Sequence, residues 1–225
     1  MLTPFLYWLI IDDQNSLLSL NHKEMRYSII ILLFLMVASC KSYNDNMIKI
    51  IFLHHSTGYN VWLGNTNKYV SKLTGKCDVK THIIKHNRRN KTNYIIEEHF
   101  FPKSAPYGWN NYPYDYYNIW VRNSGTEPYL EEPTLEMLSS EYDVIIFKHC
   151  FPVSKISQDS GQPDINSPVK SLENYKLQYQ ALKNKMHQFP ANKFVIWTPA
   201  VNTSSLMSED EGLRTKEFYE WMNNV

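Results

Sequence analysis

Three short apolar runs are the feature that most restricts how this chain can fold. They cover residues 48–53 (IKIIFL), 143–148 (DVIIFK) and 194–198 (FVIWT). Each has the length and the β-branched content of a buried strand. Residues 78–86 (DVKTHIIKH) predict a further, weaker strand. Helical patterns separate these runs, and strands that alternate with helices indicate an α/β fold whose parallel sheet is covered on both faces.

Residues 167–189 predict the longest helix of the chain, with Ser167 as its N-cap and Pro168 in its first turn. Its apolar residues fall on one face: Leu172, Tyr175, Tyr179, Leu182, Met186 and Phe189. Residues 60–73 predict another helix, which would end at Gly75 because glycine readily adopts the left-handed conformation of a C-terminal cap.

The last helix is predicted to begin at a capping box formed by Ser208 and Glu211. It would carry Phe218 and Trp221 on its apolar face. Residues 87–133 show little periodicity and predict an insertion rich in loops, a kind of segment that usually serves a function when it is this long.

The N-terminal region has the layout of a signal peptide. Residues 25–40 contain basic Arg26, a short apolar run and small residues before Cys40. This ending resembles the lipobox of bacterial lipoproteins, which implies cleavage before Cys40 and a lipid anchor on that residue in the bacterial cell envelope. Residues 47–225 would then form the folded domain, and residues 1–24 a mis-called extension. The alternative for residues 25–40 is a buried element that ends at a cysteine.

Charge and cysteine usage exclude several classes of function. The 23 basic and 22 acidic residues give a net charge of +1, and this balance does not predict binding of nucleic acid. No cysteine spacing indicates a zinc site. Cys77 and Cys150 could pair in an oxidising compartment, and their separation in the sequence neither demands nor excludes it.

Polar residues gather where the three apolar runs end. His54, His55 and Ser56 follow the first run, residues 148–152 end and follow the second, and residues 199–202 follow the third. Ligands bind beyond the carboxyl ends of parallel strands, so Ser56 could be held there as a nucleophile beside the backbone donors of a helix N-terminus. Alternatively, Ser56 simply caps that helix. Adjacent histidines on a strand point to opposite faces, which favours packing or hydrogen bonding over a shared metal site.

The stretches IIFLHHSTG and DVIIFKHCFPVS resemble a divergent branch of the SGNH (GDSL-type) hydrolases among lipoproteins of the Bacteroidetes. The resemblance covers about residues 48–225 and implies a three-layer, doubly wound parallel sheet of the flavodoxin-like type. It implies that Ser56 is the nucleophile, that Gly125 is the glycine of the second block, and that Cys150 stands at the position of the oxyanion-binding asparagine. It also implies hydrolysis of acyl esters of carbohydrates without a cofactor or a metal.

The catalytic Asp-x-x-His block of that family has no counterpart after residues 194–198. We therefore expect the fold to lack its last strand and ester hydrolysis to be impaired, with His55 or His149 as a substitute base. Because adjacent residues cannot easily form a dyad, His149 does not indicate that Cys150 is a nucleophile. The rival function is that of a non-catalytic, membrane-anchored lipoprotein that binds glycans. Its aromatic segment, residues 107–120, would be either a sugar platform or a packed flap.

Overall fold

The computed structural model describes residues 47–198, 202–203 and 205–224. The predicted extension, the predicted signal peptide and Cys40 lie outside the described residues.

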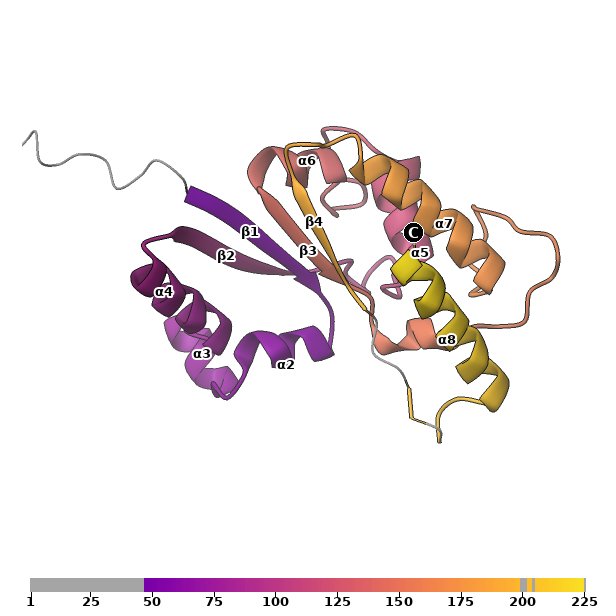
Figure 1. Cartoon of the computed structure of the whole chain (residues 1–225), viewed down its shortest axis with the longest axis horizontal. Helices are drawn as coiled ribbons and strands as arrows, with labels where there is room; N and C mark the ends of the chain where they lie inside the picture. The colour runs from indigo at the N-terminus through magenta and orange to yellow at the C-terminus, as the bar shows by residue number, and fades with distance from the viewer. Residues whose placement is uncertain (1–46, 199–201, 204, 225) are drawn as a thin grey trace, which may run out of the picture. The chain divides into compact units, whose positions relative to one another are not determined.

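Four strands form one sheet in the order β2–β1–β3–β4, and all of them are parallel (Figure 1). The strands are β1 (Met47–His54), β2 (Asn93–Phe100), β3 (Val144–Lys148) and β4 (Lys193–Trp197). The prediction of an α/β fold with a parallel sheet is confirmed, and the three apolar runs form β1, β3 and β4. Because the strands are parallel, their carboxyl ends meet at one edge of the sheet.

Helices lie on both faces of the sheet and give a three-layer arrangement (Figure 1). One face carries α2 (Thr57–Leu63), α3 (Lys68–Thr74) and α4 (Asp78–Asn90). The other carries α5 (Pro113–Tyr117), a π-helix (Asn118–Arg122), α6 (Leu135–Glu141) and α7 (Leu172–Met186). A short 3-10 helix (Phe151–Ser154) follows β3, and α8 (Glu209–Asn224) packs against α7.

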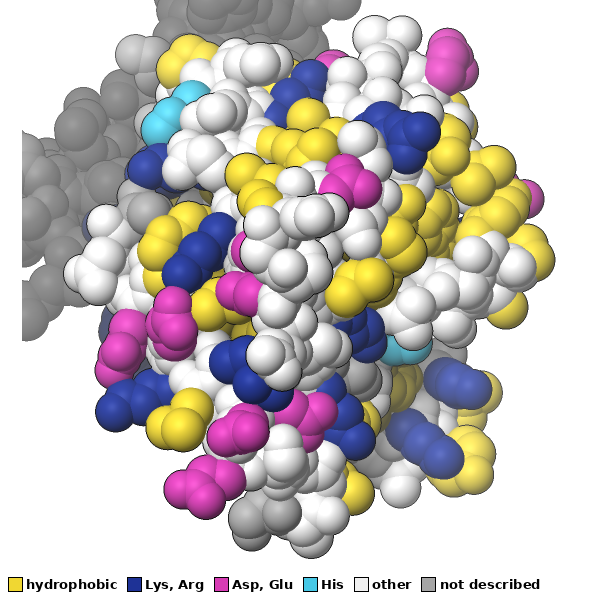
Figure 2. All heavy atoms as spheres, turned by 90° about the vertical axis from the view of Figure 1, so that its right-hand side faces the viewer, with side chains coloured by type: hydrophobic (Ala, Val, Ile, Leu, Met, Phe, Trp, Pro, Cys, Tyr) yellow, Lys and Arg dark blue, Asp and Glu magenta, His cyan; other side chains and the backbone are white. Residues whose placement is uncertain are grey.

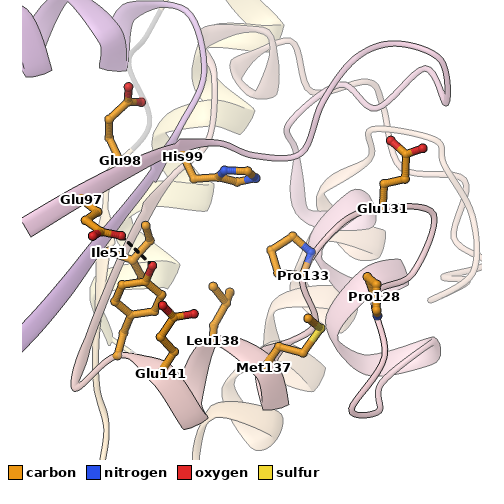
Figure 3. Close-up of a pocket in the computed structure, with 11 residues that line it drawn as sticks. Ile51, Glu97, Glu98, His99, Pro128, Glu131, Pro133, Met137, Leu138 and Glu141 are labelled. Atoms are coloured by element: carbon orange, nitrogen blue, oxygen red, sulfur yellow. Dashed lines mark hydrogen bonds between the residues drawn. The ribbon is translucent and has the colours of Figure 1, made fainter. Parts of the chain in front are cut away.

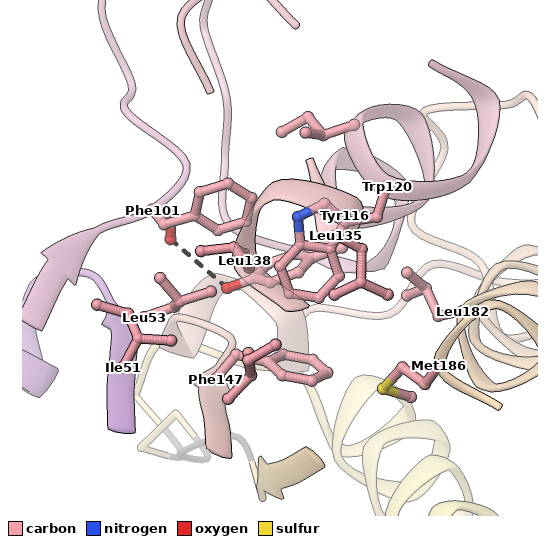
Figure 4. Packing of buried hydrophobic residues seen from close by; sticks show 12 residues of the cluster. Ile51, Leu53, Phe101, Tyr116, Trp120, Leu135, Leu138, Phe147, Leu182 and Met186 are labelled. Carbon is pink, nitrogen blue, oxygen red and sulfur yellow. Dashed lines mark hydrogen bonds between the residues drawn. The ribbon is translucent and has the colours of Figure 1, made fainter. Parts of the chain in front are cut away.

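Side chains of β1 alternate between the two helical layers, as the period of a strand requires. Ile51 and Leu53 point into the largest core, on the side of α5, α6 and α7 (Figure 4). This core also contains Phe101, Tyr116, Trp120, Leu135, Phe147 and Leu182. Phe52 points the other way and packs with Trp62 of α2 and with Cys77, the residue before α4.

The prediction of a strand at residues 78–86 is wrong, because these residues form the first part of α4. The backbone N–H of Lys80 donates to the Cys77 sulfur, which caps the helix, and Val79 packs toward the sheet. The β-branched residues that predicted a strand therefore belong to a helix. The strand at this edge of the sheet is β2, which lies inside residues 87–133 where mainly loops were expected.

The single helix predicted at residues 60–73 consists of two helices. Gly64 ends α2 with a φ of 59°, and the Asn67 side chain then caps α3 by accepting a hydrogen bond from the next turn. Gly75 ends α3 in the left-handed conformation, as predicted, with a φ of 67°. The break turns the chain so that α2 and α4 can both lie against β1 and β2.

The two C-terminal helices follow their predicted patterns closely. The residues of the predicted apolar face that lie in α7 are buried, whereas Phe189 is half-buried and lies beyond the end of the helix at Met186. The helix also begins about four residues later than expected, because Ser171 rather than Ser167 is its N-cap. In α8 the predicted capping box is present, since Ser208 N–H donates to the Glu211 carboxylate and Glu211 N–H donates to the Ser208 hydroxyl.

The sheet is not fully covered at β4. This edge strand leaves Val195 46% exposed and Trp197 40% exposed on the face that carries α2. Helices α2 and α4 pack over β1 and β2 and do not extend across this part of the sheet (Figure 1). Since parallel sheets are normally covered on both faces, this apolar strip is unusual for the fold.

Candidate active site

Ser56 lies on the sharp turn that joins β1 to α2, at the carboxyl edge of the sheet. Its side chain is exposed, and its backbone adopts φ 45° and ψ −105°, a region that residues other than glycine rarely occupy. Two hydrogen bonds hold the turn, from Gly58 N–H to His55 O and from Tyr59 N–H to Ser56 O. Such strained residues persist only where the surrounding structure fixes them, and they cluster at functional sites.

The Ser56 hydroxyl does not cap α2, and it makes no hydrogen bond to any residue that the structure describes. Capping is the role that serine most often has at the start of a helix, and it is not the role seen here. The side chain is therefore free to meet a ligand at the carboxyl edge.

Gly58 explains why α2 can start so close to the strand. A Cβ atom at this position would lie 2.4 Å from the Cβ atom of His54 and 2.7 Å from its Cγ atom. His54 is fully buried, and its ring packs against Phe52 and Phe100 at centroid distances of 4.7 and 5.1 Å. The first turn of α2 thus rests directly on the buried histidine, and only glycine fits between them.

The His54 ring also contacts an acidic residue of β2. Its Nε2 atom lies 2.8 Å from the Glu98 carboxylate, although the angles are not those of a hydrogen bond. We treat the pair as a close polar contact. Together with the aromatic packing, it assigns His54 a structural role beneath the turn and not one at the surface beside Ser56.

Lys148 lies across the sheet edge from this turn, at the end of β3. The residue is only 5% exposed, and its Nζ atom donates a 3.1 Å hydrogen bond to the hydroxyl of Thr57, the residue after Ser56. Burial lowers the pKa of Lys148, and nearby Cys150 only partly opposes that effect. Among the described residues, no carboxylate forms an ion pair with this amine.

His55 is half-buried and lies edge-on to the Phe100 ring at a centroid distance of 6.0 Å. Burial is the largest cause that lowers its pKa, and the charges of His54 and Lys148 lower it further. The imidazole is therefore mostly neutral at pH 7 and able to accept a proton. It makes no hydrogen bond to the Ser56 hydroxyl within the described part of the chain.

His149 lies on the other side of the sheet. Its ring is fully buried among Tyr116 of α5 and Tyr179 of α7, at centroid distances of 4.6 and 5.5 Å. Burial lowers the pKa of His149 to about 3, and the backbone of Asn111 only partly opposes that effect. This environment favours a packing role over that of a base for Ser56.

The two residues predicted for the oxyanion site lie in different places. Cys150 directly follows His149; it is buried and free, and its N–H donates to Asn111 O over 3.2 Å. Gly125 lies in the loop before α6, where its carbonyl oxygen accepts a hydrogen bond from the Thr134 hydroxyl. Its φ of 153° is one that glycine adopts most easily. Cys77 is also free and buried, so the two described cysteines do not form a disulfide.

The aromatic segment at residues 107–120 is mainly a packed layer. Its buried rings are Tyr112, Tyr116, Tyr117 and Trp120, and they contribute to the cores around α5 and α7. Tyr107 and Trp109 are only half-buried and lie 6.4 Å apart between ring centroids. These two rings contact each other and are accessible enough for a sugar to reach.

Two hollows lie away from Ser56. One of about 400 Å³ lies between β2 and α6 and includes Glu97, His99 and Met137 among its lining residues (Figure 3). Another, of about 200 Å³, is apolar and lies between α7, β4 and α8. On that side of the molecule hydrophobic, basic and acidic side chains are intermixed (Figure 2).

Searches among known proteins give no relative on which to base an assignment. No protein-family model matches the chain, and no curated protein or solved structure matches it significantly. None of the described helices is both long and apolar enough to span a membrane. No group of three or more histidine, cysteine, aspartate or glutamate side chains in residues 47–198, 202–203 and 205–224 is arranged to hold a metal ion.

Sequence reasoning singled out Ser56 and His55 but assigned no role to Lys148 or Thr57. Lys148 ends an otherwise apolar strand, and this was the available signal, because a strand interior rarely accepts a lysine without a reason. The pairing of Lys148 with Thr57 could not be read from the chain, since the two residues are far apart in sequence. The spacing of Ser56 and Gly58 also matches the second half of a G-x-S-x-G nucleophile elbow, with His54 in place of the first glycine.

Proposed function

We propose that this chain is an SGNH-type serine ester hydrolase that acts on acyl esters of carbohydrates, with Ser56 as the nucleophile. The observation that carries the proposal is the geometry of Ser56. Its exposed hydroxyl has no hydrogen bond to the described residues and sits on a strained strand-to-helix turn at the carboxyl edge of a parallel sheet. This is the placement that holds a nucleophilic serine accessible in other α/β hydrolases.

In the proposed reaction Ser56 attacks the ester carbonyl carbon and forms an acyl-enzyme, which water then hydrolyses. The backbone N–H group of Ser56 would be one donor to the oxyanion. The oxyanion roles of Gly125 and Cys150 rest on the resemblance alone, because the two residues lie in different parts of the fold. A base must remove the proton of the serine, because a neutral hydroxyl is a poor nucleophile. Within the described residues no histidine is hydrogen-bonded to Ser56, so turnover of simple esters is expected to be slow.

Two aromatic rings support the proposed substrate class. The half-buried rings of Tyr107 and Trp109 could stack on a sugar, as aromatic side chains with an apolar face commonly do. The same rings would serve a non-catalytic glycan-binding lipoprotein, which is the alternative function. We further propose that the protein is held in the bacterial cell envelope by a lipid on Cys40, as the sequence predicts.

The test is labelling of the purified protein with a fluorophosphonate probe, which reacts with activated serines, followed by mass mapping of the adduct. We expect one adduct on Ser56 and none in Ser56→Ala. Ser71→Ala is the matched control, because Ser71 lies inside α3, where no strained turn presents it. Absence of an adduct on folded wild-type protein would overturn the proposal. Retention on immobilised acylated glycans by both wild type and Ser56→Ala would then favour the glycan-binding alternative.

A further inference from the structure

Lys148 has an environment that its position in the sequence does not explain. Its side chain lies at the carboxyl end of β3 on the face that carries α2, and it reaches the first residue of that helix. There the amine donates to the Thr57 hydroxyl over 3.1 Å. The partner is thus the residue next to the exposed Ser56 hydroxyl.

A charged amine is disfavoured at this position for two reasons. Lys148 is 5% exposed, so its charged form loses most of its hydration, and no described carboxylate pairs with it. The titratable groups that interact with it are His55 of the β1–α2 connection and His149 and Cys150 after β3. Glu98, an acidic side chain of β2, contacts His54. Burial therefore dominates and lowers the pKa of Lys148.

We propose that Lys148 is the general base for Ser56, and that the Thr57 hydroxyl is a positioning residue that orients its amine. The inference rests on the proposed function, and it supplies the base that the histidines do not provide. A lysine that loses its proton easily is an established partner of a nucleophilic serine. Hydrogen bonds between a base and its nucleophile are often long before substrate binds and shorten in the complex.

The proton balance of the reaction is complete with these groups. Neutral Lys148 takes the proton of the Ser56 hydroxyl while the serine oxygen bonds to the ester carbonyl carbon. When the tetrahedral intermediate collapses, the carbon–oxygen bond to the alcohol breaks, and the alcohol oxygen takes that proton from the amine. Water then attacks the acyl-enzyme and gives a proton to Lys148, which returns it to Ser56 as the carboxylic acid leaves.

The three histidines near the carboxyl edge fit this role less well. His149 lies in the core on the opposite face, and its pKa of about 3 would keep it unprotonated in the intermediate. His54 is buried against Glu98 and lies beneath Gly58. His55 is the remaining rival, and its ring rests on Phe100. A variant of His55 must therefore be compared directly with variants of Lys148.

The test measures the rate of fluorophosphonate labelling at Ser56 as a function of pH. Lys148→Met is expected to slow labelling by about 100-fold or more, as the loss of a general base does. Lys148→Arg should slow labelling by as much, since arginine keeps its charge and cannot release a proton. A loss at His55→Phe as large as that expected at Lys148→Met would overturn the role of Lys148 in favour of His55. Lys155→Met changes an exposed lysine and should not differ from wild type. In wild type the rate should rise with pH as the amine loses its proton.

A second measurement does not depend on labelling. Reductive ¹³C-methylation followed by NMR titration should show Lys148 with a pKa below the value of about 10.4 that exposed lysines have. Thr57→Val should shift that titration and slow labelling by up to about 100-fold, because it removes the orienting hydroxyl. A rate at Lys148→Met or Lys148→Arg equal to that of wild type would overturn the role of Lys148 while leaving Ser56 as the nucleophile. An ordinary lysine titration would also overturn it. Absence of an adduct on wild type would overturn the proposed function itself, and the role of Lys148 as its base would fall with it.

Discussion

Replacing Gly58 by alanine tests the contact that shapes the turn at Ser56. The added Cβ atom would lie 2.4 Å from the His54 Cβ atom, and an ordinary contact begins at about 3.4 Å. The first turn of α2 would therefore have to move by about 1 Å. His54 cannot move aside, because the atom that is met belongs to the root of a fully buried side chain.

The expected loss of stability follows from the cost of adding a methyl group to a packed core. Inserting a methyl group without space costs about 1–3 kcal/mol. In a domain of this size each kcal/mol lowers Tm by about 2–4 °C, so Gly58→Ala should melt about 2–12 °C below wild type. The displacement should also move the Ser56 hydroxyl, and labelling by the fluorophosphonate probe should slow by up to about 100-fold.

Gly212→Ala is the matched control for this experiment. Gly212 lies in α8, and the nearest atom that its Cβ would meet is the Met207 Cε atom at 3.6 Å, an ordinary contact. Alanine is favoured over glycine in a helix by about 0.5–1 kcal/mol, so this variant should melt slightly above wild type. If Gly58→Ala melts at or above the temperature of wild type, the close approach of α2 to His54 is not what shapes the turn.

The remaining predictions concern a helix cap, a buried acid and the proposed anchor. Ser171→Ala should lower Tm by about 2–4 °C, since it removes the cap of α7; Ser167→Ala should have less than half that effect, and equal effects would contradict the assigned cap. Burial raises the pKa of Asp115 to about 7, so the folded state keeps a proton that the unfolded chain releases near pH 4. Stability should therefore fall between about pH 4 and pH 7, and Asp115→Asn should remove that decline in melting curves across this range. A fatty-acid probe fed to the producing cells should label wild type but not Cys40→Ala, and equal labelling would refute lipidation of that residue.

Local patterns in the sequence determined a large part of the fold. The apolar runs predicted β1, β3 and β4, because a buried strand needs a short apolar segment wherever it lies in the sheet. The buried face of α7 and the capping box of α8 were equally readable, since both depend on residues three or four positions apart. Ser56 also stood out, because a polar residue directly after a strand marks the edge where ligands bind.

Tertiary structure decided the rest. Residues 78–86 have a composition that suits a strand, yet packing of Val79 toward the sheet and the cap at Cys77 make them helical, because burial outweighs a weak intrinsic preference. Strand β2 became recognisable only when it paired with β1 at the edge of the sheet. The surroundings of Ser56 depend on contacts between distant parts of the chain, above all the hydrogen bond from Lys148 to Thr57. The sequence by itself thus determined which segments are apolar and where a nucleophile could lie. Only the assembled sheet brought the buried amine of Lys148 to Thr57, the residue next to Ser56.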